Sequence, residues 1–363
     1  MNKKTSKKII LGVSGGVDSA VVLYLLKKQG FDVMGVFLEF DVWKNKKNLL
    51  KENTCGNEDC FNRAKNICNF FDVKCKKINV KSDFQENVIK YFINDLKQNN
   101  TPNPCVMCNR FVKIQKLIDI MKEYKADFVA TGHYAKVLFN LETKEYELKK
   151  PVDKSKDQTY FLSYLTQKQI KYLKFPLANY YKKDVYLMAK KLKLDIFDRI
   201  KQSQDFCFID NKSINDFLIE TLGKEKGDMI DDSGCILGKH NGLYFYTLGQ
   251  RKGIGLSGGP FYVLGKDLNR NILVVTKNKN KIFKKEFCVK KFNLINTLSE
   301  KDINNKGASV QIRYADKKGK CKIEFINSKK IKIVLDKPKI AVTPGQIAVV
   351  YIKDQCIGGG IIC

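Results

Sequence analysis

Histidine and arginine are scarce in this sequence of 363 residues. Only two histidines occur, His133 and His240, which excludes a metal site built mainly from imidazole groups. Only six of the 67 basic residues are arginine, although arginine is hard to replace where a planar, bidentate group must hold a phosphate or carboxylate. Arg110, Arg251 and Arg313 therefore gain interest, because each lies within a motif described below.

Long apolar runs are also missing. No stretch of about 18 apolar residues occurs, so we expect no membrane-spanning helix and no membrane partner. The N-terminal stretch enters a predicted strand within about ten residues, so we expect no secretory or transit peptide. The twelve cysteines are scattered along the chain, which favours reduced thiols over a disulfide framework. These features together predict a cytoplasmic protein.

Lysine, by contrast, is abundant and gives the chain a formal net charge of +29. A polyanionic partner such as nucleic acid explains an excess of this size. A genome rich in lysine codons explains part of it equally well, because asparagine is also abundant and arginine is rare. Composition alone leaves both explanations open.

The pattern of apolar residues changes along the chain. A short apolar run at residues 7–13, a helical pattern that ends at Gly30 and a second apolar run at 31–40 predict a βαβ unit. The same alternation continues through the first half, which predicts a doubly wound α/β domain with a parallel sheet. After about residue 205 short strands and turns replace it, and from about residue 274 the pattern predicts a small antiparallel barrel.

Residues 14–19, SGGVDS, form the predicted turn between the first strand and the first helix. Parallel α/β sheets bind ligands at the carboxyl ends of their strands, where this turn belongs. Gly15 and Gly16 let backbone N–H groups approach an anion, and the helix N-terminus favours negative charge. Asp18 would repel a phosphate by itself, so it makes sense chiefly as a ligand of Mg²⁺. No Gly-Lys-Ser/Thr sequence ends the turn, which excludes a Walker loop.

SGGVDS resembles the signature of the PP-loop ATP pyrophosphatase superfamily. The resemblance implies cleavage of ATP between its α and β phosphates and adenylation of a carbonyl-type oxygen. Adenylation makes that oxygen part of a good leaving group, which a nucleophile then displaces. Cys105 and Cys108, three residues apart in NPCVMCNR, suggest that the nucleophile is sulfur carried by the enzyme.

Eight motifs in order give a closer resemblance: GVSGGVDSA, TPNPCVMCNRFVK, ATGHYAKV, KDQTYFLSYL, QDFCFI, YTLGQRKGIGL, VQIRY and TPGQIAVVY followed by GGG. Together they are similar to the bacterial-type tRNA-specific 2-thiouridylase family, from about residue 7 to residue 362. The resemblance implies sulfur replacing the C2 oxygen of the tRNA wobble uridine, with ATP consumed to AMP and pyrophosphate. It also implies a PP-loop catalytic domain at residues 1–208, a small central tRNA-binding domain at 209–273 and a C-terminal antiparallel β-barrel at 274–363.

The same resemblance implies site residues, motif by motif. Cys207 in QDFCFI is the implied persulfide carrier, and Cys108 releases the sulfur by attacking that persulfide. Arg110 and Lys113 are expected to keep the thiolates in positive surroundings. The implied ATP site comprises Gly12, Val13, Ser14, Gly15, Gly16, Val17, Asp18, Ser19, Leu38 and Gly132, with Mg²⁺ on Asp18. The implied tRNA contacts are Asn103, Pro104, Cys105, His133, Lys156, Asp157, Gln158, Arg313, Tyr314 and Gln346.

Cys105 departs from the commoner family pattern, in which an aspartate at this position is assigned proton transfer. A thiol of lowered pKa serves the same purpose in a persulfide relay. In an alternative mechanism, Cys105, Cys108 and Cys207 hold an iron–sulfur cluster whose open iron binds the sulfide to be transferred. A structural zinc site also fits the spacing, although no fourth ligand is evident.

The predicted partners are tRNA and a sulfur-donor protein, either a persulfide carrier or a cysteine desulfurase, and we expect a monomer. The glycine-rich, basic segment 249–259 is expected to order on tRNA.

Two competing functions make different demands on the cysteines and on the glycine loop. A PP-loop ligase that transfers ammonia or lysine needs neither Cys108 nor Cys207. A non-catalytic tRNA-binding descendant would be expected to have lost Asp18 or the loop serines, which are all present.

Overall fold

The computed structural model describes residues 6–46, 48, 58–193, 208–209 and 213–363. The chain divides into two compact units. The first comprises Met1–Ile89, Cys105–Ser213 and Asp354–Ile357, and the second comprises Lys90–Pro104, Ile214–Lys353 and Gly358–Cys363. None of the described helices is both long enough and apolar enough to cross a membrane. Cys207 lies outside the described residues.

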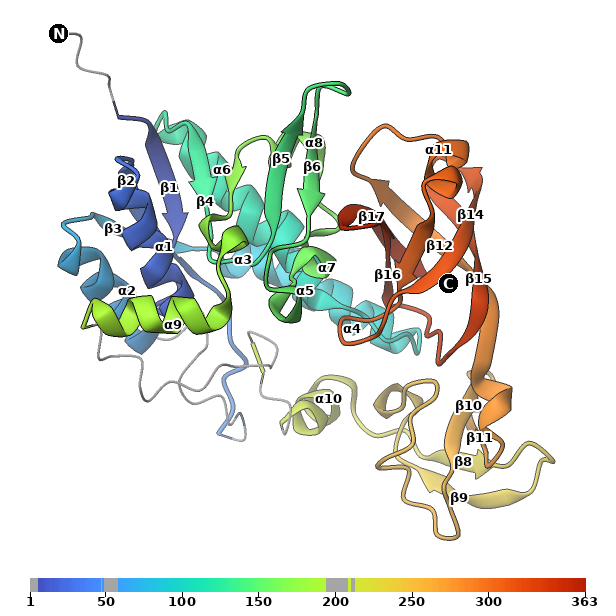
Figure 1. Ribbon diagram of the computed structural model, residues 1–363. Coiled ribbons are helices and arrows are strands. Elements are labelled where there is room, and N and C mark those ends of the chain that lie inside the picture. The colour runs from blue at the N-terminus through green and yellow to red at the C-terminus, as the bar shows by residue number, and fades with distance from the viewer. Residues whose placement is uncertain (1–5, 47, 49–57, 194–207, 210–212) are drawn as a thin grey trace, which may run out of the picture. The chain divides into compact units, whose positions relative to one another are not determined.

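The first unit is built on a parallel sheet of five strands, in the order β3-β2-β1-β4-β7 (Figure 1). This arrangement confirms the predicted doubly wound α/β class. Because successive residues of a strand point to opposite faces, Ile9 and Leu11 join one core cluster and the buried Ile10 points the other way. The strands are β1 (Lys8–Gly12), β2 (Asp32–Glu39), β3 (Cys75–Asn79), β4 (Phe128–Ala130) and β7 (Leu173–Lys174).

Helices cover this sheet. The core cluster on one face contains apolar residues of α1 (Val17–Lys28), α2 (Glu58–Phe70) and α9 (Lys182–Lys191) (Figure 1). A further helix, α6 (Ile114–Glu123), packs against β1 and β4. The remaining elements of the unit are α3 (Lys81–Phe84), η1 (Gln85–Ile89), α5 (Pro104–Met107), η2 (Cys108–Lys113), β5 (Lys136–Asn140), β6 (Glu145–Lys149), η3 (Lys154–Lys156), α7 (Thr159–Leu162), α8 (Gln167–Ile170) and η4 (Pro176–Asn179).

Six antiparallel strands close into a barrel, which belongs to the second unit except for residues 355–357. They follow the order β12-β15-β14-β13-β16-β17, and the pairing of β17 with β12 completes the ring. This barrel confirms the prediction made from the alternation of β-branched runs and turns. Its strands are β12 (Phe283–Leu294), β13 (Ala308–Gln311), β14 (Gly319–Asn327), β15 (Lys330–Ile340), β16 (Ile347–Ile352) and β17 (Gln355–Ile362), and α11 (Glu300–Asn305) lies between β12 and β13 in the chain.

The second unit also contains a smaller sheet of order β10-β11-β8-β9, with its own apolar core around Val263 and Leu273. This sheet is the predicted small central part of the chain. The helix α4 (Lys90–Lys97) groups with this second unit, although its sequence follows the α/β pattern. The strands and helices are α10 (Ile214–Leu222), β8 (Gly227–Ile230), β9 (Ile236–His240), η6 (Leu243–Phe245), β10 (Tyr262–Asp267), β11 (Ile272–Thr276) and η7 (Lys279–Ile282).

Candidate functional site

The glycine loop joins β1 to α1 at the carboxyl end of the parallel sheet, as predicted. Gly15 has a φ of +78°, and a Cβ atom there would lie 2.6 Å from the carbonyl oxygen of Cys60. Glycine is therefore required by both the backbone conformation and the space. Gly16 caps α1, and the buried Ser19 donates its hydroxyl hydrogen to the Gly16 oxygen at 2.8 Å. The backbone N–H groups at this helix start are suited to an anion.

Asp18, in the first turn of α1, accepts two hydrogen bonds at the same oxygen. The Nζ atom of Lys182 lies 2.6 Å from Asp18 Oδ1, and the hydroxyl of Tyr134 donates to Oδ1 at 2.9 Å. Burial lowers the pKa of Lys182, although the Asp18 carboxylate acts in the opposite direction. Burial and the Asp18 charge both raise the pKa of Tyr134, so its phenol stays protonated as a donor. Sequence reasoning missed Lys182, whose place at the start of α9 gave no sign of its partner.

The residues of ATGHY bring a second loop to Asp18. β4 ends at Ala130, and the chain turns before β5 begins at Lys136. A Cβ atom on Gly132 would lie 3.2 Å from the Asp18 Cβ atom, so the two loops are in close contact. His133 Nδ1 lies 2.7 Å from Thr131 Oγ1. Burial, with a smaller effect of Lys113, lowers the pKa of His133 to about 3, so this imidazole is neutral at pH 7.

The two neighbouring cysteines lie on consecutive helical segments. Cys105 is half-buried in α5, whereas Cys108 is buried and begins the π-helix η2. Short π-helices occur often at functional sites. The next residue, Asn109, is 6% exposed, and its Oδ1 atom has no hydrogen-bond partner among the residues that the structure describes. Lys113 ends the same π-helix, which continues directly into α6, the helix that packs against β1 and β4. The structure brings the glycine loop and the ATGHY loop into contact, and the Cys108 helix leads into the helix that covers the strands before both loops.

Arg110 contacts a backbone carbonyl group and two aromatic rings. Its guanidinium group donates to the Tyr164 carbonyl oxygen at 2.7 Å and lies over the rings of Phe111 and Tyr164. Gln169 donates its amide hydrogen to the Arg110 carbonyl oxygen at 3.0 Å. Burial lowers the pKa of Arg110, which nevertheless remains charged at neutral pH. These contacts attach η2 to the segment around α7 and α8.

Leu38 of the predicted ATP site and the predicted tRNA contacts at residues 156–158 all lie within the described residues. Leu38 is buried near the carboxyl end of β2, two residues beyond Val36, which pairs with Gly12 of β1. Asp157 holds the start of α7 by accepting from the Thr159 N–H and hydroxyl, and it forms an ion pair with Lys150 at 2.6 Å. Gln158 accepts from the Tyr134 N–H at 2.9 Å, and Lys156 is half-buried at the end of η3.

The remaining predicted tRNA contacts belong to the second unit. Tyr314 is 43% exposed, and the exposed Arg313 donates to the carbonyl oxygens of Ile340 and Ala341 at 3.0 and 3.3 Å. Gln346 donates its amide hydrogen to the Thr101 carbonyl oxygen at 3.0 Å, close to the predicted contacts Asn103 and Pro104.

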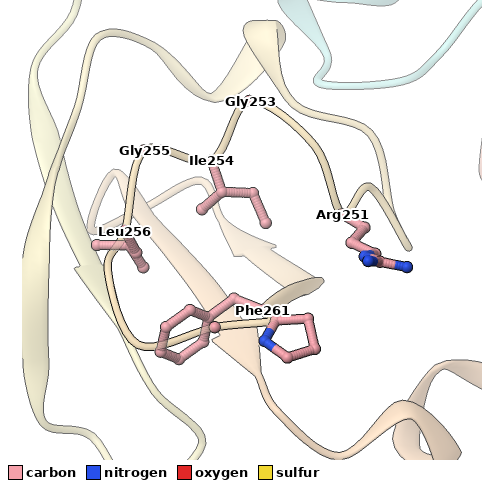
Figure 2. Close-up of a pocket in the computed structure, with 8 residues that line it drawn as sticks. Arg251, Gly253, Ile254, Gly255, Leu256 and Phe261 are labelled. Carbon is pink, nitrogen blue, oxygen red and sulfur yellow. The ribbon is translucent and has the colours of Figure 1, made fainter.

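The segment 249–259 forms the wall of a hollow of about 370 Å³. Figure 2 shows the Arg251 side chain at one side of this hollow and the apolar side chains of Ile254, Leu256 and Phe261 around the rest. Gly253 and Gly255 have positive φ values that other residues rarely adopt.

Of the three cysteines predicted to take part in sulfur transfer, the structure describes Cys105 and Cys108 but not Cys207. Phe208, the residue after Cys207, is buried, and its carbonyl oxygen accepts from the Trp43 N–H at 3.1 Å. Among the residues that the structure describes, no three His, Cys, Asp or Glu side chains are grouped closely enough to hold a metal ion. Because Cys207 is outside that set, the persulfide, cluster and zinc hypotheses all remain predictions.

Comparison with known proteins covers almost the whole chain. Residues 7–211 match the tRNA methyl transferase HUP domain, 215–277 the tRNA methyl transferase PRC-barrel domain and 284–362 the aminomethyltransferase beta-barrel domain. The tRNA-specific 2-thiouridylase MnmA of Buchnera aphidicola subsp. Acyrthosiphon pisum is 39% identical, over 99% of this chain and 97% of its own. The proteins of the same name from Mycoplasma capricolum and Acetivibrio thermocellus are 37% and 36% identical, over at least 98% of both chains. The chain therefore belongs to the tRNA-specific 2-thiouridylase family.

Proposed function

We propose that this enzyme replaces the C2 oxygen of the wobble uridine of tRNA with sulfur, and that it uses ATP to activate that oxygen. Membership of the family supports a tRNA sulfurtransferase. The observation that supports the ATP-dependent route is the glycine loop at the start of α1, with its positive φ at Gly15 and no room for a side chain. Such a loop binds phosphate through backbone N–H groups.

In the proposed first step, the uridine C2 oxygen attacks the α phosphorus of ATP, and pyrophosphate leaves. The backbone of residues 12–19 holds the phosphates, and Leu38 and Gly132 lie beside the nucleotide. Asp18 is the carboxylate that would hold Mg²⁺, which would neutralise phosphate charge. The product of this step is a uridine whose C2 oxygen is bonded to AMP.

In the proposed second step, the outer sulfur of a persulfide on Cys207 attacks C2. The Cys108 thiolate attacks the inner sulfur of Cys207, so that the S–S bond to the transferred sulfur breaks and a Cys108–Cys207 disulfide forms. AMP leaves with the former C2 oxygen, and the nucleobase keeps the sulfur. A thiol reductant then restores the two cysteines, and a sulfur-donor protein reloads Cys207. Cys105 takes or gives a proton near the base.

For tRNA, we propose contacts from both units. In the first unit these are Cys105, the neutral His133, and Lys156 with Asp157 and Gln158. In the second they are Asn103, Pro104, Arg313, Tyr314 and Gln346. Arginine and lysine suit phosphate, and the exposed Tyr314 ring suits a stacked base. We keep residues 1–208, 209–273 and 274–363 as the proposed domains, and a cytoplasmic monomer as the proposed form.

The test is a reconstituted reaction with unmodified tRNA, ATP, Mg²⁺ and a persulfide donor. We expect 2-thiouridine at the wobble position, with AMP and pyrophosphate as the nucleotide products. Asp18→Asn should abolish thiolation and leave tRNA affinity intact, because Asp18 is not among the proposed tRNA contacts. If ADP and phosphate are the products, the adenylation route is wrong. Equal loss of thiolation and of tRNA binding in the variant would indicate misfolding.

A further inference from the structure

Lys182 is a buried cation in contact with the glycine loop. Its side chain is 8% exposed, and its Nζ atom lies 2.6 Å from Asp18 Oδ1. The ammonium group also lies 4.9 Å from the centre of the Tyr186 ring and 5.7 Å from that of Tyr134. Burying a charged group costs free energy unless a partner compensates it. The Asp18 carboxylate is that partner.

The backbone around Lys182 is fixed as firmly as its side chain. Its N–H, at the first position of α9, donates to Asp153 Oδ2 at 2.9 Å. Asp153 is 7% exposed, and its other oxygen accepts from the Ser155 N–H and hydroxyl. Burial favours a higher pKa for Asp153, but these hydrogen bonds hold the pKa below its usual value. A buried carboxylate thus anchors the start of α9 so that Lys182 faces the loop.

Asp18 presents a problem for any site that binds a triphosphate. Its negative charge lies in the first turn of α1, where the helix start and the loop N–H groups attract anions. A carboxylate there repels phosphate unless a positive charge neutralises it. We propose that Lys182 is a positioning residue of the nucleotide site: it fixes the Asp18 carboxylate and neutralises it, so that the glycine loop accepts the phosphates of ATP even without a divalent cation.

This inference rests on the proposed ATP site but makes a separate claim about it. If Mg²⁺ alone neutralised Asp18, ATP would bind only together with the metal. If Lys182 neutralises Asp18, ATP binds in a chelator, and Mg²⁺ adds affinity without being required. The two cases differ in an equilibrium measurement that involves neither tRNA nor sulfur.

The experiment is calorimetric titration of ATP into the full-length protein, in EDTA and in Mg²⁺. We expect the wild type to bind in both. Lys182→Met should bind about tenfold or more weakly in EDTA, because an unpaired carboxylate then faces the phosphates, and Mg²⁺ should recover most of the loss. Lys182→Arg keeps the charge and should stay within about threefold of the wild type.

Two further variants separate charge from packing. Tyr134→Phe removes a neutral hydrogen bond from the same Asp18 oxygen and should change affinity in EDTA by less than about threefold. Asp18→Asn combined with Lys182→Met removes both charges and should recover ATP binding in EDTA. Recovery in this double variant also shows that loss in the single variant is not a folding defect.

The outcomes distinguish the two proposals. Wild-type protein that binds ATP only with Mg²⁺ overturns the role of Lys182, as does Lys182→Met that binds like the wild type in EDTA. Loss in Lys182→Met that the double variant fails to reverse also overturns it. Wild-type protein that binds ATP in neither condition overturns the proposed ATP site, and the role of Lys182 with it.

Discussion

At the scale of single residues, Gly15 makes the closest backbone approach of the glycine loop. A Cβ atom there would meet the Cys60 oxygen at 2.6 Å, whereas one on Gly30, which has a similar φ of +80°, would meet nothing within 4 Å. Both Gly→Ala changes carry a backbone cost of about 1 to 2 kcal/mol. We expect only Gly15→Ala to lose ATP affinity as well, measured by titration beside thermal unfolding. Equal ATP affinity in the two variants would contradict a phosphate role for the loop.

His240 predicts a pH dependence of stability. The buried imidazole accepts from the Gly242 N–H at Nδ1 and contacts the Asn271 carbonyl oxygen through Nε2, each at 3.1 Å, which fixes the neutral form. Burial lowers its pKa below the ordinary value of 6.5, although the Asn271 carbonyl acts the other way. Below pH 6.5, His240 binds a proton in the unfolded state before it does so in the folded state. The contribution of the neutral imidazole to the free energy of unfolding is therefore complete above pH 6.5 and is lost as the pH falls.

The measurement is the urea midpoint across this pH range. The wild-type midpoint should fall as the pH decreases, and His240→Gln should show a shallower fall. The variant should keep part of the pH dependence of the urea midpoint, because burial also lowers the pKa of His133. Identical slopes in the two proteins would show that His240 titrates normally.

At the scale of elements, the segment from α5 to η2 decides between the two sulfur mechanisms. In the proposed relay, Cys105 is not a sulfur carrier, so Cys105→Asp should keep substantial activity, whereas Cys108→Ser should abolish thiolation because a hydroxyl cannot release the persulfide sulfur. Protein purified without oxygen should contain no iron. Cys105→Ala is the decisive variant. If this variant is active and holds no iron, the cluster mechanism is excluded. If the wild-type protein is active only with about four irons per chain, the persulfide relay is excluded.

At the scale of the whole molecule, the charge of +29 predicts a strong effect of salt on tRNA affinity. Each neutralised phosphate contributes about 0.7 to 0.9 to the log–log slope, so several contacts should give a slope of several units. Arg313→Ala should weaken binding more than Lys320→Ala, an exposed position outside the motifs in the same barrel. Thermal unfolding of both variants shows whether the loss of the two hydrogen bonds from Arg313 to carbonyl oxygens lowers stability, which would weaken binding indirectly. A flat salt response would favour codon bias as the origin of the lysines.

Much of this architecture was predictable, because apolar periodicity reports directly which strands and helices bury a face. The parallel sheet, the glycine loop between β1 and α1 and the closed barrel were all expected. The contact of Lys182 with Asp18 was not, because it joins residues 164 positions apart through the packing of α9. Nor did periodicity show that the chain turns at Gly132, where an added Cβ atom would lie 3.2 Å from the Asp18 Cβ atom. The surroundings of Cys207 remain a prediction.

The last strand has a consequence for synthesis on the ribosome. Gln355 and Cys356 of β17 pair with β6 in the first unit, and Ile362 pairs with Val289 of β12 to close the barrel in the second. Since β17 follows every other strand in chain order, neither unit has its full set of strand pairs while these eight residues are inside the exit tunnel. A nascent chain stalled before β17 would therefore expose the edges of β6 and β12 together, and both edges would gain their partner only when β17 emerges.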